Sequence, residues 1–505
     1  MTEPTIPSRR PTYGNWRLPA RPGIGTLGLT GTVVLLGGIV LALVTALLSW
    51  MAGAGVALAV AVVTVPLAIR TVDGRSGFSV LASRAGWLLR RVSGQAAYAS
   101  GPVSRVPGGR CRLPGLLSGL RMLEASDPQG RRFGVIHDPG LNSYTVVLEC
   151  DPDGGALVDA AQVDRWVSGW GGLLSELANE PGLLGAAVVV ETAPDPGTGL
   201  AAEVLPQLSP SAPRAARDIM TGLVASYPAA SSSTSTYVTL TYRPAVPGRR
   251  LAGRDERDAD MLAALAVRVP PLAAALAVAG AGAAAALPPD RIADAMRIAF
   301  DPSAAATILE ARAESGSSGQ EWESAGPVSA QETADSYRHE SAVSRTWVAS
   351  EAPRGTVRST VLRGLLEPSA RVARKRVTLL YRPLDQASAA RIVESDRRTA
   401  HFMASSSFGL VRARAAGAVR AAEQTAAEEA SGAALTEFGL IVTATVNAPG
   451  DLRAADAELA NLAASARLRL RVARGQQASA FAAALPAGLL PWLHTFVPYQ
   501  LRSAL

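Results

Sequence analysis

The strongest pattern in the chain is a long apolar run near its N-terminus. From Pro22 to Ile69 there are 48 consecutive uncharged residues. One membrane crossing requires about 20 apolar residues, so this run is long enough for two helices and a tight turn. We expect the helices at about Leu27–Leu48 and Gly53–Ile69, with the turn at residues 49–51 and Trp50 at the membrane–water interface.

Two other interpretations of this region are less favoured. A cleaved signal peptide has one short apolar core, whereas here a second apolar stretch follows at once, and cleavage would still leave an anchor. Residues 23–28 read Gly-Ile-Gly-Thr-Leu-Gly and match the dinucleotide-binding fingerprint. That fingerprint requires a preceding strand within a βαβ unit, and Arg21-Pro22 precedes it here, so we interpret the match as chance.

A third apolar run, Met261–Leu287, is expected in the body of the protein and not in the membrane. It contains Arg268 and the pair Pro270-Pro271, and it is rich in alanine. An arginine at the centre of a membrane helix costs about 2.5–3.5 kcal/mol on insertion scales, which alanine hardly offsets. We therefore expect a buried, interrupted helix.

The net charge of the chain is concentrated around the N-terminal hairpin. Residues 1–91 hold nine arginines against Glu3 and Asp73, which gives +7, the net charge of the whole chain. Residues 92–505 therefore carry forty basic and forty acidic side chains. Because both flanks of the hairpin are basic, the positive-inside rule places both in the cytoplasm. The neutral body gives no global case for nucleic-acid binding.

The segment after the hairpin, Phe78–Val92, carries apolar residues at helical spacing, with Arg84, Arg90 and Arg91 between them. Such a basic amphipathic helix could lie along the cytoplasmic face of the membrane, where anionic headgroups attract it. Packing against the soluble body explains the pattern about as well, and the sequence leaves both alternatives open.

The rest of the chain alternates short β-type segments with amphipathic helices, after a loop-rich stretch at Gly101–Gly115. We expect helices at 163–177 and 211–226 and a turn at Asp138-Pro139-Gly140. A Ser-rich linker is expected at Ala229–Ser235 and a Gly/Ser-rich linker at Glu314–Ala330. The expected strands are Phe133–His137, Tyr144–Cys150, Ala186–Thr192, Thr236–Arg243, Leu440–Val446 and Leu468–Val472.

The stretch Tyr237–Pro244 resembles Arg376–Pro383, since both contain Val-Thr-Leu and end in Tyr-Arg-Pro. This echo suggests an internal duplication, although two such strands could also arise by coincidence. The predicted fold class is a membrane-anchored α+β protein, with a two-helix transmembrane hairpin before a mixed α/β cytoplasmic body that contains the hypothesised duplication. The expected segments are a basic N-terminus (1–26), the hairpin (27–70), an amphipathic connector and loop (71–115), a first α+β unit (116–313), a linker (314–345) and a second α+β unit (346–505).

Lys375 is the only lysine, beside 48 arginines, and its position excludes one activity. A phosphate-binding Walker loop contains Gly-Lys-Ser/Thr, whereas Lys375 lies between Arg374 and Arg376, so the chain is not a P-loop ATPase. Three cations in a row could touch phosphate, but they more often protect the edge of a sheet. Cys111 and Cys150, the only cysteines, fit a reducing compartment.

The histidines do not indicate a catalytic site. There are four, namely His137, His339, His401 and His494. His137-Asp138 lies where a strand meets a turn, and turn polar groups are usually satisfied locally. Asp335 and His339 would share a helix face at i, i+4, but two ligands do not make a metal site, and an exposed ion pair is the better interpretation. The acidic residues of Glu423–Glu429 fit a solvated helix face. We predict no catalytic, cofactor-binding or metal-binding residues and no enzyme activity.

Seven short motifs carry a resemblance to a known family. They are Tyr13-Gly14-Asn15-Trp16, Tyr98-Ala99-Ser100-Gly101-Pro102, Leu113-Pro114-Gly115-Leu116-Leu117, Phe300-Asp301-Pro302, Ala325-Gly326-Pro327, Pro353-Arg354-Gly355 and Leu485-Pro486-Ala487-Gly488. Their order, with the two-helix start, resembles an actinobacterial family of integral membrane proteins encoded in conjugative elements. Members of that family often have PrgI-like or TrbE-like neighbours.

The resemblance implies a component of a type IV secretion, or conjugation, apparatus. In it a PrgI-like membrane hairpin would be joined to a region like the N-terminal, non-catalytic part of a TrbE/VirB-type ATPase. We expect a multi-pass plasma-membrane scaffold whose partners are membrane lipids, secretion ATPases and channel subunits. No cofactor, small-molecule substrate or general nucleic-acid binding is expected, and self-association stays open. The alternatives are a membrane subunit of a type VII (ESX-like) secretion system and a membrane-tethered enzyme of unrecognised type.

Overall fold

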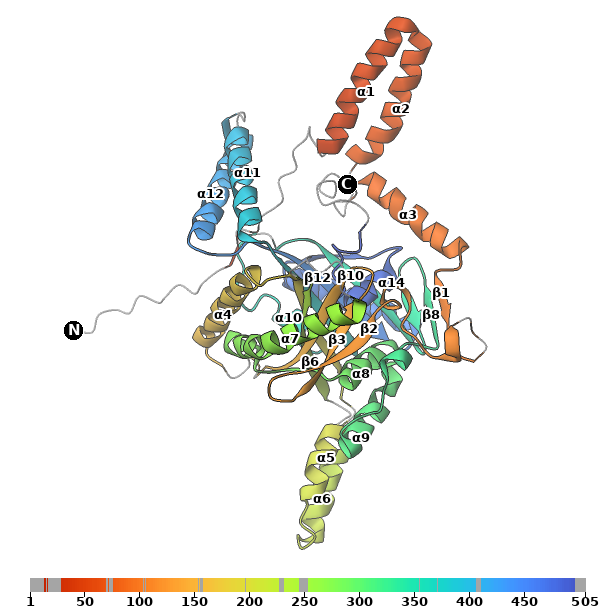
Figure 1. The fold of residues 1–505 in the computed structure, drawn as a ribbon, viewed down its shortest axis with the longest axis vertical. Coiled ribbons are helices and arrows are strands. Elements are labelled where there is room, and N and C mark those ends of the chain that lie inside the picture. The colour runs from red at the N-terminus through yellow and green to blue at the C-terminus, as the bar shows by residue number, and fades with distance from the viewer. Residues whose placement is uncertain are drawn as a thin grey trace, which may run out of the picture.

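The computed structural model describes residues 13, 14, 16, 29–69, 71, 76–102, 104, 106–152, 154, 158–195, 197–226, 231–244, 253–353, 355–369, 371–405 and 410–495. Its body is one 13-stranded sheet covered by helices (Figure 1). Three antiparallel helical hairpins, α1–α2, α5–α6 and α11–α12, project from this body.

The strands pair antiparallel throughout the described sheet. In chain order they are β1 (Ala97–Ala99), β2 (Arg121–Ser126), β3 (Arg132–Asp138), β4 (Ser143–Asp151), β5 (Leu183–Pro194), β6 (Ser232–Tyr242), β7 (Ala283–Ala286), β8 (Ser329–Glu332), β9 (Tyr337–His339), β10 (Ala342–Glu351), β11 (Arg374–Pro383), β12 (Thr436–Val446) and β13 (Arg469–Val472).

The α-helices lie between these strands and before them. They are α1 (Leu29–Leu48), α2 (Trp50–Ala68), α3 (Gly77–Val92), α4 (Ala160–Ala178), α5 (Thr198–Gln207), α6 (Arg214–Ser226), α7 (Arg254–Leu276), α8 (Pro289–Phe300), α9 (Ala305–Ser315), α10 (Arg363–Leu366), α11 (Gln386–Ser405), α12 (Leu410–Ala430), α13 (Leu452–Ser465) and α14 (Gln477–Ala483).

The two N-terminal apolar helices predicted from the sequence are confirmed. Both α1 and α2 are long and apolar enough to cross a membrane. The turn is tighter than expected, because Ser49 alone separates the helices and its extended backbone (φ −160°, ψ 125°) reverses the chain. Helix α2 therefore begins at Trp50, three residues before the predicted start at Gly53.

A third segment, Asp255–Ala281, is also long and apolar enough to cross a membrane by length and composition alone. It comprises most of α7 and a short π-helical turn that follows. Met261, Leu265 and Val269 are buried on one face of α7 and pack into the cluster that covers β4 and β6. Arg268 donates a hydrogen bond to the carbonyl of Pro181 at 2.9 Å. One face of helix α7 is thus packed against the sheet, as expected, but the predicted interruption is wrong at the prolines, because the helix continues through Pro270-Pro271.

The sheet contains one connectivity twice. Its order is β1-β8-β9-β10-β12-β11-β5-β6-β4-β3-β2, with β7 beside β4 and β13 beside β10. Going outward from the central β5–β11 pair, β5-β6-β4-β3-β2 mirrors β11-β12-β10-β9-β8. A helical hairpin interrupts each unit at the same place, α5–α6 before β6 and α11–α12 before β12. This is the connectivity that the hypothesis of an internal duplication requires.

The sequence echo does not align these two units. Tyr237–Pro244 begins in β6 and Arg376–Pro383 lies in β11, whereas β6 corresponds by position to β12. Residues 329–345, assigned from sequence to a linker, form β8, β9 and the start of β10. Residues 232–235, expected in the Ser-rich linker, belong to β6. In each case strand pairing with a distant segment orders a stretch whose composition suggested a loop.

The expectation that Arg374, Lys375 and Arg376 protect a sheet edge is wrong. They open β11, which lies between β12 and β5 in the interior of the sheet, and all three are buried. Glu191 of β5 pairs with both arginines, and its Oε2 accepts from Nε of Arg376 at 2.8 Å. Burial alone would raise the pKa of Glu191, but the two guanidinium groups outweigh it and the pKa is lowered. The cations therefore hold the two units together.

Candidate membrane interface

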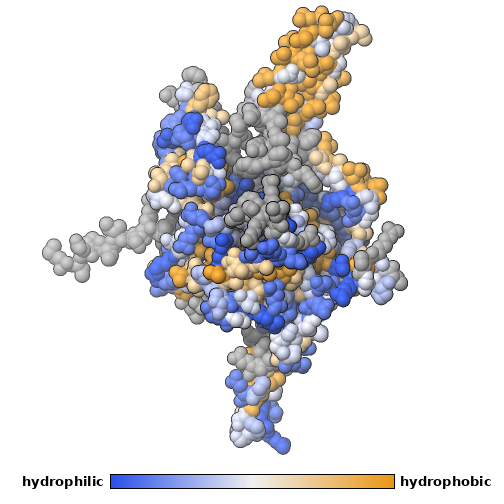
Figure 2. All heavy atoms as spheres, in the orientation of Figure 1, coloured by the Kyte–Doolittle hydropathy of each residue, from blue (hydrophilic) through white to orange (hydrophobic). Residues whose placement is uncertain are grey.

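Helices α1 and α2 present apolar side chains to their surroundings on nearly every side (Figure 2). Leu47, Leu48 and Trp50, at the turn between the helices, are 88%, 85% and 77% exposed. Monomeric soluble proteins rarely leave so large a continuous apolar surface uncovered. This surface is the candidate membrane-spanning part of the chain.

The two helices pack through small residues. A Cβ atom built on Gly53 would lie 2.5 Å from the Cβ of Ala46, and one built on Gly38 would lie 2.4 Å from a methyl carbon of Val60. The hydroxyl of Thr64 donates to the carbonyl of Val60 at 2.8 Å and so needs no partner outside the helix. Small residues at the contact and internally satisfied polar groups are typical of helices that associate in lipid.

The segment before the hairpin is attached to the body. Tyr13 forms a two-way backbone bridge with Val357, with N···O distances of 2.8 and 2.7 Å. The indole of Trp16 meets the ring of Phe438 edge-to-face, with 5.1 Å between centroids. The motif Tyr13-Gly14-Asn15-Trp16, of which Asn15 lies outside the described residues, therefore contacts the second unit of the sheet.

The segment after the hairpin is attached to the same body through α3. The amide of Gly77 donates to the carbonyl of Ile69 at 2.8 Å, so α3 begins directly against the end of α2. Further along, the guanidinium of Arg90 donates to the carbonyl of Gly475 and lies 3.4 Å from the carboxylate of Glu332. Gly475 has φ +70°, and its Cα approaches Trp87 so closely that a Cβ would lie 3.1 Å from that side chain.

Two other motifs, 98–102 and 325–327, take part in contacts between distant segments. The amide of Ser100 donates to the carbonyl of Val328 at 2.8 Å, and its hydroxyl donates to that of Pro327 at 2.9 Å. Gly326 has no room for a side chain, because a Cβ there would lie 2.1 Å from the carbonyl oxygen of Arg112. In these two motifs, the residues hold distant segments of the chain against each other.

His137 lies at the end of β3 in a packed environment. Its ring stacks on Tyr144 with 4.4 Å between centroids and an interplanar angle of 4°. The hydroxyl of Tyr144 donates to Asp258 at 2.6 Å, and burial together with this carboxylate raises the pKa of Tyr144. The phenol therefore stays protonated and donates to Asp258.

The expectation that Asp335 and His339 share a helix face is wrong, because both belong to the β8–β9–β10 region. Asp335, in the turn between β8 and β9, lies 2.7 Å from Arg345. His339 is buried; Nδ1 donates to the carbonyl of Phe300 at 2.6 Å, and Nε2 accepts from Ser344 at 2.7 Å. Burial lowers the pKa of His339 to about 4, so its imidazole is neutral and structural.

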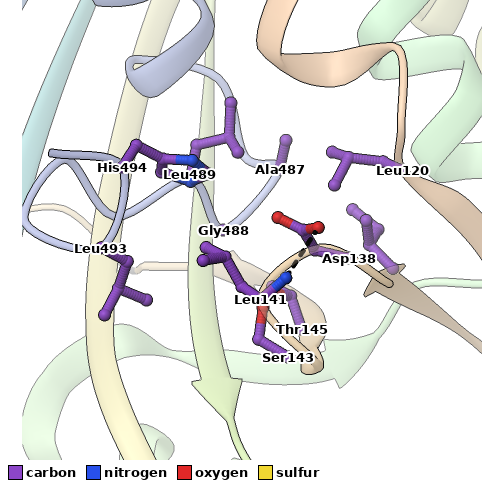
Figure 3. A pocket seen from close by; sticks show the side chains of 11 residues that line it. Leu120, Asp138, Leu141, Ser143, Thr145, Ala487, Gly488, Leu489, Leu493 and His494 are labelled. Carbon is purple, nitrogen blue, oxygen red and sulfur yellow. Dashed lines mark hydrogen bonds between the residues drawn. The ribbon is translucent and has the colours of Figure 1, made fainter. Parts of the chain in front are cut away.

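The remaining candidates also lie apart. His401 of α11 is 3.4 Å from Glu423 of α12, and the acidic residues of that helix lie on exposed or half-exposed positions. His494 lines a pocket with Asp138 and Thr145 (Figure 3). The cavity there holds about 10 Å³, which is the space of one water molecule and not of a cofactor. Among the described residues there is no group of three or more His, Cys, Asp or Glu that could hold a metal ion.

Both cysteines are reduced in the structure. Cys150 is buried in β4, and burial raises the pKa of its thiol to about 11. Cys111 is half-exposed, and its carbonyl oxygen accepts a hydrogen bond from the amide of Gly326 at 2.7 Å. Cys111 is thus the accessible thiol of the two.

The residues that join the hairpin to the body were not identified from the sequence. Glu332, Phe438 and Val357 carry no local signal, because their partners Arg90, Trp16 and Tyr13 lie hundreds of residues away in the chain. Only the basic amphipathic pattern of 78–92 pointed to this region, and it left two alternatives open. The structure places one face of that helix on the body.

A family model described as a domain of unknown function (DUF8461) matches residues 20–79. No curated protein matches the chain. The matched segment contains α1, α2 and the first residues of α3, and it ends before the sheet begins. The similarity therefore falls on the candidate membrane hairpin, and the description of the family assigns it no function.

Proposed function

We propose that this chain is a non-enzymatic scaffold anchored in the plasma membrane by α1 and α2, with its N-terminus and its body in the cytoplasm. In this proposal it is a subunit of a conjugative type IV secretion apparatus and docks transfer ATPases at the membrane.

The observation that carries the anchoring is the attachment of both flanks of the hairpin to one body. Tyr13 precedes α1 and pairs with Val357, while Arg90 follows α2 and pairs with Glu332. A single crossing would put these two attachments on opposite sides of the bilayer. Two crossings return the chain to the side where it started, and the basic residues of both flanks favour the cytoplasm for that side.

The secretion role rests on the family resemblance and on the shape of the body. The α5–α6 hairpin projects from the end of the molecule opposite α1 and α2 (Figure 1). Ile219 and Leu223, four residues apart on α6, are 68% and 58% exposed. An amphipathic helix with such a face is suited to packing against another protein, and we assign a transfer ATPase as that protein.

Disulfide trapping tests the arrangement in native membranes. Tyr13 and Val357 form a hydrogen-bonded antiparallel pair, whose Cα atoms are about 5.5 Å apart, within the range that a disulfide bridges. We expect the pair Tyr13→Cys and Val357→Cys to cross-link on oxidation in a Cys111→Ser background. The matched pair Tyr13→Cys and Ser211→Cys, with Ser211 in the exposed turn of the α5–α6 hairpin, should not. Absence of the first cross-link would remove the shared-body argument.

The thiol of Cys111 reports the side of the membrane. It should react with a membrane-impermeant maleimide in lysed cells and not in intact cells. Labelling of Cys111 in intact cells would overturn the cytoplasmic assignment.

Affinity purification from native membranes tests the secretion role. We expect a secretion ATPase or a channel subunit of a conjugative system to co-purify, and Ile219→Asp with Leu223→Asp to reduce that recovery. Recovery of ESX-type components would favour the type VII alternative, and recovery of neither class would contradict a secretion scaffold.

A further inference from the structure

Helix α3 has two opposite faces with different surroundings. Ser83, Trp87 and Arg90 face the body, where they approach Gly475. At 100° per residue, the opposite side of the helix carries an apolar face of four residues, which we call the α3 apolar face. These residues are Leu81, Leu88, Leu89 and Val92, and they are 55%, 55%, 70% and 81% exposed.

We propose that α3 lies in the plane of the membrane, with the α3 apolar face inserted among acidic phospholipids, and so fixes the orientation of the body relative to the bilayer. This inference rests on the proposed anchoring of α1 and α2. For residues 78–92 the sequence left open contact with the membrane or packing against the body. In this proposal both hold, because one side of α3 contacts the body and the other contacts lipid.

The position of α3 favours lipid as the partner of the α3 apolar face. The amide of Gly77 binds the carbonyl of Ile69 at the end of α2, so α3 starts where the proposed membrane span ends. From there α3 runs sideways, away from the base of the hairpin, and does not continue the direction of α2 (Figure 1). Apolar atoms continue from the hairpin onto this helix (Figure 2). An interfacial helix buries its apolar face about 5–10 Å into the boundary between headgroups and acyl chains.

The charge of α3 also favours lipid. The helix contains three arginines and no acidic residue. Arg90 is used against Glu332. Arg84 and Arg91 are exposed on the helix beside the α3 apolar face, and the guanidinium of Arg91 also lies 5.4 Å from the centroid of the Trp87 ring. Arginines at this place can reach the phosphates of anionic headgroups while the leucines enter the acyl region.

The size of the α3 apolar face argues against a second protein as its binding partner. Helix α3 has 16 residues, and one of its faces is already used against the body. The α3 apolar face has four residues, whereas a specific protein interface takes about 20–30 residues from each partner. Lipid needs no such minimum area, because the hairpin already holds α3 at the surface.

Depth-dependent fluorescence quenching in the full chain tests the proposal. Single cysteines replace Leu88, Leu89 or Val92 in a Cys111→Ser background and carry an environment-sensitive dye. Cys150 stays in place because its thiol is buried. The protein is reconstituted into vesicles of phosphatidylcholine and phosphatidylglycerol that contain brominated phospholipids. Ser211→Cys, in the turn of the α5–α6 hairpin, is the matched control.

We expect bromolipid to quench the dye at Leu88→Cys, Leu89→Cys and Val92→Cys several-fold more than at Ser211→Cys, and iodide in the buffer to show the reverse order. Dyes on α3 that iodide quenches and bromolipid does not would place the face in water and overturn the proposal. Dyes protected from both quenchers would show a protein cover and overturn it as well.

Two further measurements test the role of the arginines of α3 and, separately, the anchoring by α1 and α2. We expect bromolipid quenching on α3 to be stronger in vesicles that contain phosphatidylglycerol than in vesicles of phosphatidylcholine alone. The double substitution Arg84→Gln with Arg91→Gln should remove most of this difference. An unchanged difference would overturn the acidic-lipid assignment. Extraction with alkaline carbonate reports α1 and α2 independently. A chain that resists extraction but shows no quenching on α3 contradicts this inference alone, whereas an extracted chain contradicts the proposed anchoring and this inference together.

Discussion

The guanidinium of Arg90 in α3 lies 3.4 Å from the carboxylate of Glu332 in β8, and this ion pair joins the helix after the hairpin to the sheet. The side chain of Glu332 is only 3% exposed, and its Oε1 also accepts from the amide of Ala478 at 3.3 Å. A carboxylate this buried depends on its cation for compensation. The position of α3 is therefore determined by a contact inside the body and not by the length of the connecting chain.

Replacing Arg90 with alanine should loosen α3. The substitution leaves the carboxylate of Glu332 buried without its cation, which costs about 1–3 kcal/mol. We expect faster limited proteolysis between α3 and β1 and a lower melting temperature in detergent. Arg84→Ala is the control, since Arg84 is exposed on the same helix. Equal protease sensitivity of the two variants would contradict the role of the ion pair.

Replacing Glu191 with glutamine should weaken the joint between the two units. Arg374 and Arg376 would remain buried with no anionic partner, and breaking a buried pair in this way costs about 3–5 kcal/mol. Thermal unfolding of the full chain in detergent measures the loss. Glu437→Gln is the control, because Glu437 pairs with Arg382 at 3.3 Å nearer the surface, where a salt bridge contributes about 0–1 kcal/mol.

The same carboxylate predicts a dependence on pH. The folded pKa of Glu191 lies below its ordinary value of 4.5, so the unfolded chain binds the proton more tightly. Its contribution to stability is complete above pH 4.5 and is lost as the pH falls through the folded pKa. We expect the difference in melting temperature between the natural chain and Glu191→Gln to shrink over that acidic range. A difference independent of pH would mean that charge pairing is not its source.

The buried ammonium of Lys375 predicts a second rise in stability with pH, in the alkaline range. Burial lowers its pKa to about 8 from an ordinary value of 10.5, so between these values the unfolded chain holds more protons than the folded one. Stability gained from this group therefore rises with pH across that window. Lys375→Met should remove the rise, which parallel unfolding curves at pH 7, 9 and 10 would show.

Replacing Gly53 with valine should separate α1 from α2. A Cβ at Gly53 would lie 2.5 Å from the Cβ and 2.8 Å from the Cα of Ala46, and backbone cannot move aside cheaply. Overpacking of this kind costs about 1–3 kcal/mol. Gly55→Val is the matched control, because nothing lies within 4 Å of its Cβ position. Cysteine cross-linking between the helices should fall for Gly53→Val and stay unchanged for Gly55→Val.

Features with a local cause could be predicted from the sequence. The uncharged run from Pro22 to Ile69 contains both N-terminal helices. Arg268 and the adjacent prolines correctly indicated that α7 packs against the sheet, although they did not interrupt the helix. The amphipathic pattern of 78–92 gave α3 to within one residue. Hydrophobic periodicity indicates which face of a single helix or strand is buried. It is sufficient for a prediction when the structure of that segment depends mainly on its own residues.

Features with a distant cause could not be predicted. The three cations 374–376 look like edge protection until Glu191 is placed beside them by the β5–β11 pairing. Asp335 and His339 have helical spacing, but pairing of β9 with β8 and β10 puts them in a hairpin. The contacts that join Tyr13 and Arg90 to the body are of the same kind. Each depends on a partner that no local pattern of residues identifies.

The β5–β11 pairing also determines when, during translation, the open edge of β5 is covered. Strands β2 to β7 are complete once the ribosome has passed Ala286, yet one edge of β5, a 12-residue strand rich in alanine and valine, stays open until 374–383 have been made. An open apolar edge is a template for pairing with other nascent chains. This edge therefore stays uncovered while the residues between β7 and β11 are translated, and we predict that messages truncated within this interval yield insoluble product.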